Sequence, residues 1–288
     1  MNLEDFKKYG FIKISNLLNK KKCLELYNHL KEDRKWDSSL FLAKEEYLKN
    51  PNPQKTNPGK NIQNLISKYD LSFIDKNRDI IKILTTILGK NYEIMLSKFV
   101  VAVPDNWMPN YVKKLLKIEA AANINPYIKR KYRDVTYFRG LDYHMDSVDW
   151  EGHNNKFITM YIYLNNVDSY MSPLNVIKKS HLNGHTPFPH YIKDFPKKKF
   201  LNYSVDNIKF SKFYKEKLIG KTGSCYIWTS NTLHGTAPSK KVSGDFRISL
   251  RYLIKKVDKS SSLIDKVLEG TEIRETRNKT IDYKKILK

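Results

Sequence analysis

Cysteine and long apolar runs are both scarce in this 288-residue chain. Its two cysteines, Cys23 and Cys225, cannot form a disulfide scaffold and do not have the spacing of a metal-binding pair. No apolar run approaches the roughly 20 residues of a membrane-spanning helix, and the first five residues lack the basic-then-apolar order of a secretory signal. These absences argue against a disulfide-rich secreted protein or a membrane protein, and predict a soluble cytoplasmic one.

Arginine is also scarce, although the formal net charge is +23. Only nine of the 53 basic residues are arginine, and the lysines recur from end to end with abundant asparagine, as in A/T-rich coding sequences. A nucleic-acid-binding protein would concentrate arginine and lysine on one face with interleaved aromatic residues. The charge is therefore interpreted mainly as a solvated surface, and a nucleic-acid partner is not expected.

The chain is rich enough in apolar residues to form a single folded domain over residues 1–288. Hydrophobic residues make up 40% of it and aromatic residues 12%, which excludes a disordered chain. Apolar periodicity and capping residues predict a helical N-terminal part over residues 1–90. Within it we expect helices over residues 3–8 and 20–34, a third helix from residue 75 or 77 to 88, a short strand over 11–14 and a loop over 51–59.

From Tyr92 the pattern changes to short β-rich runs separated by turns, as in an antiparallel barrel or double sheet. We expect this β core to span residues 91–257, followed by a charged tail or helix over 258–288. An interruption over 104–140 is long enough to be a lid or binding loop. The candidate strands cover residues 92–103, 156–164, 174–177, 223–229 and 246–254.

Three separated elements of the sequence indicate a metal site. His144 and Asp146 are two residues apart, so in extended backbone both side chains project to the same face. His234 lies between two later β-like runs, and Arg247 follows it by thirteen residues. Two histidines and one carboxylate form the facial triad of non-haem Fe(II) oxygenases. An arginine suits the distal carboxylate of 2-oxoglutarate, because its planar fork donates two parallel hydrogen bonds.

Four motifs in the same order make the sequence resemble the phytanoyl-CoA dioxygenase (PhyH) family of Fe(II)/2-oxoglutarate oxygenases over most of its length. FKKYGFIKISNLL at residues 6–18 is similar to the family's N-terminal helix and strand. SPLNVIKKSHLNGH at 172–185 resembles its G-x-L-x-V-x-P-G-S-H strand and turn, with Ser172 for glycine and Lys178-Lys179 for Pro-Gly. GSCYIW at 223–228, followed by LHGT at 233–236, resembles the strand before the distal histidine, and His144-Met-Asp146 resembles the first two ligands.

The resemblance implies a mainly β fold with α-helices, a double-stranded β-helix (jelly roll, cupin-like) with N-terminal helices packed on it. It implies His144, Asp146 and His234 as catalytic iron ligands, with 2-oxoglutarate and O2 as cosubstrates. Arg247 and Thr236 would hold 2-oxoglutarate. Because Asp146 is present, the resemblance indicates a hydroxylase that yields succinate and CO2, and not a halogenase.

Five further residues are candidates for binding. Thr159 and Tyr161 share a face of one strand and are candidates for the cofactor site, if that face lines it. Trp150 is a candidate wall of the substrate pocket or a core residue. Lys98 is a candidate inward-facing cation or a strand-edge lysine. Arg139 belongs to the basic, tyrosine-rich end of the 104–140 segment, which favours an anionic small-molecule substrate if that segment caps the site.

Two other functions remain open at this point. A protein hydroxylase would use the basic surface to recruit an acidic partner and would have a wide, open cleft. A non-catalytic binding protein on the same fold would have no physical need for His144, Asp146, His234 and Arg247 together. The sequence leaves open a monomer or a homodimer. A nucleic-acid demethylase is not favoured, because no base-stacking platform is evident.

Overall fold

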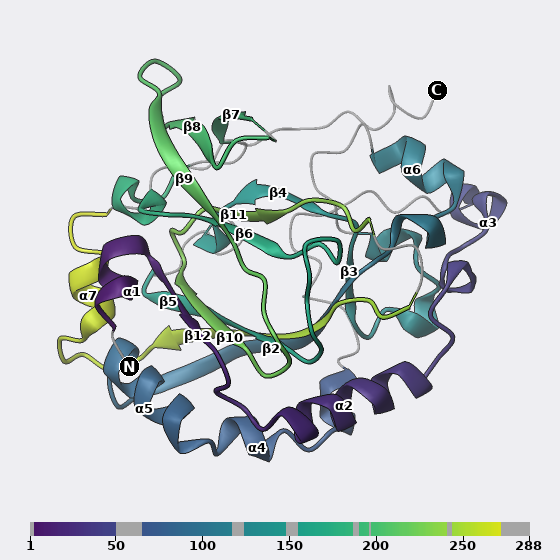
Figure 1. Cartoon of the computed structure of the whole chain (residues 1–288), viewed down its shortest axis with the longest axis horizontal. Coiled ribbons are helices and arrows are strands. Elements are labelled where there is room, and N and C mark those ends of the chain that lie inside the picture. Colours follow the sequence, from purple (N-terminus) through teal and green to yellow (C-terminus); the bar gives the residue numbers. More distant parts are fainter. Residues whose placement is uncertain are drawn as a thin grey trace.

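Two six-stranded sheets face each other in the computed structural model of the chain (Figure 1). The structure describes residues 3–49, 65–116, 124–147, 155–186, 190–195, 197–240 and 244–271. The major sheet has the order β1 (Phe11–Ile14), β10 (Cys225–Thr229), β5 (Phe157–Tyr163), β12 (Ile248–Lys256), β2 (Tyr92–Ala102) and β3 (Thr136–Phe138). The minor sheet has the order β4 (Leu141–His144), β11 (His234–Thr236), β6 (Leu174–Ile177), β9 (Ser211–Lys217), β8 (Phe200–Ser204) and β7 (Tyr191–Asp194). This is the predicted jelly-roll architecture.

The central strands β5 and β10 of the major sheet are buried on both faces, which explains their nearly continuous apolar sequences. On β5, Ile158 and Met160 point outward into the core shared with the helices, while Thr159 and Tyr161 point inward between the sheets. All seven residues of β5 are buried. The inner face of β5 therefore carries polar and aromatic side chains, and its outer face carries aliphatic ones and Met160.

Helices cover the outer face of the major sheet (Figure 1). Asn19 caps α2 (Lys20–Glu32) and Asn77 caps α5 (Arg78–Leu88), each with its side-chain oxygen. The other helices are α1 (Glu4–Tyr9), α3 (Lys44–Lys49), α4 (Ser72–Asp75), α6 (Asn110–Leu116) and α7 (Leu263–Val267). Single 3₁₀ turns lie at Ser38–Leu40, Leu65–Lys68, Asp105–Trp107, Asn125–Tyr127, Arg130–Tyr132 and Ser180–Asn183. Among the described residues, none of these helices is long and apolar enough to cross a bilayer.

Most expected elements are confirmed, and the exceptions have a physical reason. β6 occupies the expected residues 174–177, and β5, β10, β12, α2 and α5 lie within two residues of their expected limits. The candidate strands did not include β3, β4, β7, β8, β9 or β11. On β9 most side chains are exposed or half-buried, and several of them are lysines. The strand therefore lacks the alternation of apolar and polar residues that would have predicted it. One neighbouring pair, β2 and β3, is parallel, whereas the expected sheets were antiparallel throughout. The expected loop at 51–59 lies outside the described residues.

The described parts of the 104–140 segment pack against the N-terminal helices. Tyr127 and Tyr137 are fully buried in the core that contains α2 and α5. Arg34, just after α2, donates to both carboxylate oxygens of Asp134 at 2.6 and 2.7 Å. Arg133 donates to the main-chain oxygens of Pro126 and Ile128 within the segment itself. Part of the positive charge of this segment therefore stabilises the fold. The role of the segment as a lid stays a prediction.

A buried histidine lies beneath the turn between α1 and β1. Gly10 ends α1 with φ at +83°, and a Cβ there would lie 2.4 Å from Nδ1 of His181. The other ring nitrogen of His181, Nε2, lies 3.2 Å from the main-chain oxygen of Lys7. Burial lowers the pKa of His181 to about 4. The histidine is therefore neutral in the folded protein at any pH well above 4.

We expect His181 to make the folded state less stable in mild acid. Between about pH 6.5 and 4 the unfolded chain binds a proton at this residue and the folded chain does not, so stability falls as the pH falls. A shift of this size lowers the free energy of unfolding by about 2 kcal/mol between pH 7 and pH 5. Urea denaturation at both pH values measures it. His181→Gln should show a pH dependence smaller by that amount, and an unchanged dependence would contradict the assignment.

Candidate metal centre

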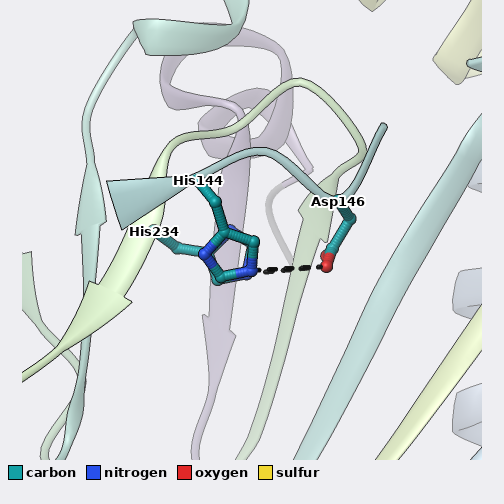
Figure 2. A group of neighbouring side chains, drawn as sticks. All are labelled: His144, Asp146 and His234. Atoms are coloured by element: carbon teal, nitrogen blue, oxygen red, sulfur yellow. Dashed lines mark ion pairs between the residues drawn. The ribbon is translucent and has the colours of Figure 1, made fainter. Parts of the chain in front are cut away.

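Three side chains that could bind a metal ion converge where the last residue of β4 pairs with the first residue of β11. His144 ends β4, His234 begins β11, and the two are direct partners in the antiparallel ladder. Asp146 follows two residues after His144, and its Oδ1 lies 3.9 Å from Nε2 of His144 and 3.7 Å from Nε2 of His234. Figure 2 shows the carboxylate directed at the two imidazoles. These separations fit one divalent ion bound at about 2 Å from each ligand atom.

The carboxylate of Asp146 is held by the major sheet. Its Oδ2 accepts hydrogen bonds from the Thr159 hydroxyl on β5 and from the indole N–H of Trp228 on β10, the latter at 3.0 Å. Asp146 is 0% exposed, so these donors replace the water that it loses. Asp146 is thus fixed by strands of the opposite sheet from the one that carries the histidines.

Arg251 on β12 forms an ion pair with the other oxygen of Asp146, Oδ1. Burial raises the pKa of Asp146, but the positive charge of Arg251 and the two histidines outweigh burial and hold the pKa well below its ordinary value. Asp146 is therefore ionised throughout the physiological range, as a metal ligand must be.

His234 is oriented for coordination through Nε2. Its Nδ1 lies 2.9 Å from the main-chain oxygen of Thr232, so the Nδ1–H donates to that carbonyl and leaves the Nε2 lone pair facing Asp146. Burial lowers the pKa of His234, against the opposing effect of Asp146. The imidazole is therefore neutral near pH 7, which is the form that binds metals.

A second group of polar atoms, called the cradle here, lies on the inward-facing sides of β11 and β12. Within the described part of the chain, Nε of Arg247 and the hydroxyls of Ser249 and Thr236 are buried without a hydrogen-bond partner. Arg247 is 2% exposed, and its Nη1 donates to the main-chain oxygen of Ser172. Because unpartnered buried polar groups are costly, these three atoms are available to hydrogen-bond a polar ligand. The positive charge of Arg247 favours an anion.

The structure also places the remaining candidates from the sequence. Thr159 contacts Asp146, and Tyr161 lies on the inner face with its ring centroid 5.8 Å from the Arg247 guanidinium carbon. Lys98, 6% exposed, lies opposite Arg251 in the ladder between β2 and β12. Arg139 forms an ion pair with Asp105, with Nε and Oδ1 3.0 Å apart. Trp150 lies outside the described residues. The binding roles of these five residues stay predictions.

Sequence reasoning missed three residues of this site: Ser249, Arg251 and Trp228. Ser249 and Arg251 stand two and four positions after Arg247 on β12, so the alternation of a strand puts all three on one face. That signal was present once Arg247 was assigned to a strand. No comparable signal existed for Trp228, which depends on the pairing of β10 with β5.

Comparisons with known proteins agree with this architecture. No protein-family model and no curated protein matches the chain, so the resemblance to the phytanoyl-CoA dioxygenase family stays a prediction. Among solved structures, the non-heme alpha ketoglutarate dependent epimerase SnoN from nogalamycin biosynthesis is 10% identical, with TM-score 0.51 over 97% of this chain and 94% of that one. The carbocyclase SnoK, also non-heme and alpha ketoglutarate dependent, is 12% identical, with TM-score 0.51 over 91% and 85%. The chain therefore shares its fold with these two proteins.

Proposed function

We propose that the chain is an Fe(II)- and 2-oxoglutarate-dependent oxygenase, related to the phytanoyl-CoA dioxygenases, that hydroxylates a small anionic molecule. The observation that carries this proposal is the presence of two features on the inner faces of the two sheets. One is the triad of His144, Asp146 and His234. The other is the unpartnered cradle around Arg247. A non-catalytic binding protein would need neither a preformed metal triad nor an anion site in addition to it.

The triad has the donor set that suits Fe(II) and leaves coordination positions open. Two imidazoles and one carboxylate on one side of an ion are the ligands of non-haem Fe(II) oxygenases. Iron bound here would supply the oxidative chemistry, with O2 and 2-oxoglutarate consumed and succinate and CO2 released. The protein orients His234 through Thr232 and Asp146 through Thr159 and Trp228, and the surrounding aromatic core excludes bulk water.

The cradle suits the distal carboxylate of 2-oxoglutarate. Arg247 offers a charged N–H donor, and the hydroxyls of Ser249 and Thr236 offer two neutral donors. A carboxylate has about four lone-pair positions and can accept from all three groups. Charge-assisted bonds from a buried guanidinium are stronger than those from hydroxyls, so we assign Arg247 the main share of the affinity.

Ser249→Ala and Thr236→Ala should each weaken 2-oxoglutarate binding about 5- to 10-fold. Each variant removes one neutral hydrogen bond worth about 1 kcal/mol and leaves Arg247 and the triad in place. An anaerobic titration of 2-oxoglutarate at saturating Fe(II) measures the affinity. Thr86→Ala removes a hydroxyl that donates to the main-chain oxygen of Lys82 on α5, and this matched control should bind 2-oxoglutarate normally. Full affinity in both cradle variants would contradict the assignment.

The proposed function is tested by adding Fe(II) and 2-oxoglutarate to the protein without oxygen. We expect a weak visible metal-to-ligand charge-transfer band, followed on addition of O2 and a suitable anionic metabolite by release of succinate. A folded protein that gives no band would contradict the oxygenase assignment. Turnover of an acidic protein, with none of small anions, would instead favour the protein-hydroxylase alternative.

A further inference from the structure

Arg251 contacts Asp146 on the side where a metal ion would bind. Its Nη2 donates to Oδ1. Oδ1 is also the oxygen that lies 3.7 and 3.9 Å from the two imidazole Nε2 atoms. The guanidinium therefore occupies one bonding position of the same oxygen that completes the triad.

Asp146 has two hydrogen-bond donors other than Arg251. Its Oδ2 already accepts hydrogen bonds from Thr159 and Trp228, on two different strands of the major sheet. A divalent ion bound to Oδ1 would repel the nearby guanidinium, because both are positive and the buried surroundings screen charge poorly. A metal ion should therefore weaken the ion pair between Arg251 and Asp146.

A second cation lies beside Arg251 in the major sheet. Lys98 on β2 is its direct partner in the ladder, and Tyr161 on β5 is its partner on the other side. Directly opposite side chains have their Cβ atoms about 5 Å apart, and like charges in such positions repel. This part of the inner face therefore favours a negatively charged ligand once a metal engages Asp146.

We infer that Arg251, with Lys98 beside it, is the binding site for a carboxylate or phosphoryl group of the substrate, and that metal binding to Asp146 makes it available. In the metal-free protein the guanidinium is bound to Oδ1 of Asp146. In the metal-loaded protein it is released toward the ligand anion. This inference rests on the proposed function and adds to it the residue that selects an anionic substrate.

The inference predicts that metal and anion strengthen each other's binding. If a metal ion releases Arg251, an anion bound to Arg251 must tighten metal binding by the same factor, because binding couplings are reciprocal. The probes are Mn(II), followed by the electron paramagnetic resonance signal of the free ion, with sulfate as a tetrahedral anion and acetate as a planar one. In the wild-type protein we expect sulfate or acetate to tighten Mn(II) binding about tenfold, and which of them does so distinguishes a phosphoryl from a carboxylate ligand.

Two variants separate this role from simple structural support. Arg251→Met removes the competitor for Oδ1, so Mn(II) should bind about tenfold more tightly without added anion, and the effect of the anions should disappear. Arg251→Gln keeps a hydrogen-bond donor for Asp146 without the charge. It should also bind Mn(II) more tightly than the wild type and respond less to the anions. Lys255→Met removes a cation from the same strand that pairs with Glu93 at the surface, and this control should match the wild type.

The outcomes are distinguishable. Weaker Mn(II) binding in both Arg251 variants would overturn the inference, because Arg251 would then be a support for Asp146. Wild-type Mn(II) affinity that changes less than twofold with either anion would overturn it as well. If the wild-type protein bound Mn(II) normally but gave no charge-transfer band with Fe(II) and 2-oxoglutarate, the oxygenase assignment would fail on its own account.

Discussion

Asp146→Asn should reduce divalent metal affinity at least about 100-fold and abolish turnover. The amide has nearly the same shape as the carboxylate and can still accept from Thr159 and Trp228 through one oxygen. It lacks the negative charge that a divalent ion requires from its only acidic ligand in the triad. The fold should therefore persist while the metal site is lost.

The measurement combines Mn(II) titration with the anaerobic Fe(II) and 2-oxoglutarate absorption band. Circular dichroism verifies that the variant is folded. Asp168→Asn serves as the control, because that carboxylate accepts main-chain N–H bonds from Tyr170 and Met171 in a turn. It should keep wild-type metal affinity. Retention of tight metal binding in Asp146→Asn would show that these three residues are not the metal centre.

Arg247→Ala should weaken 2-oxoglutarate binding by about 100-fold while metal affinity stays within a few-fold of the wild type. The guanidinium is the only charged member of the cradle, and a charge-assisted hydrogen bond from its Nε contributes about 1.5–3 kcal/mol. Arg247→Lys should recover only part of the loss, because an ammonium group is a point charge and cannot reproduce the planar fork.

The same two titrations measure the metal affinity and the 2-oxoglutarate affinity separately. Mn(II) binding reports the triad, and the charge-transfer band at saturating Fe(II) reports 2-oxoglutarate. Arg139→Ala is a useful comparison, because Arg139 pairs with Asp105 and should leave 2-oxoglutarate affinity unchanged. If Arg247→Ala retained wild-type affinity for 2-oxoglutarate, the cradle would belong to another ligand.

The sequence was most informative where chemistry and local geometry coincide. The spacing of His144 and Asp146 predicted two side chains on one side of the chain, and the structure brings them to His234. Asn19 and Asn77 predicted helix starts through local side-chain bonds that need no tertiary contact. Such features are encoded within a few residues, so they can be read without knowledge of the fold.

Residues whose role depends on strand pairing could not be read in this way. Trp228 and Arg251 reach Asp146 from β10 and β12, 82 and 105 positions away in the chain. Their contact depends on which strands are neighbours and on the register between them, and neither is encoded locally. β9 was also not predicted from its own residues, because a strand with exposed faces lacks the apolar alternation that identifies a strand.

The pairing of β1 with β10 has a consequence for how the chain folds. β1 lies at residues 11–14, yet its hydrogen-bonding partner lies at 225–229, and Tyr27 of α2 donates to the main-chain oxygen of Phe246, 219 positions away. Almost the whole chain must therefore be synthesised before the N-terminal segment can form these native contacts. Domains dominated by such distant contacts fold slowly and expose unpaired strand edges on the way. We expect this protein to fold after synthesis rather than during it, and to need protection from aggregation in that interval.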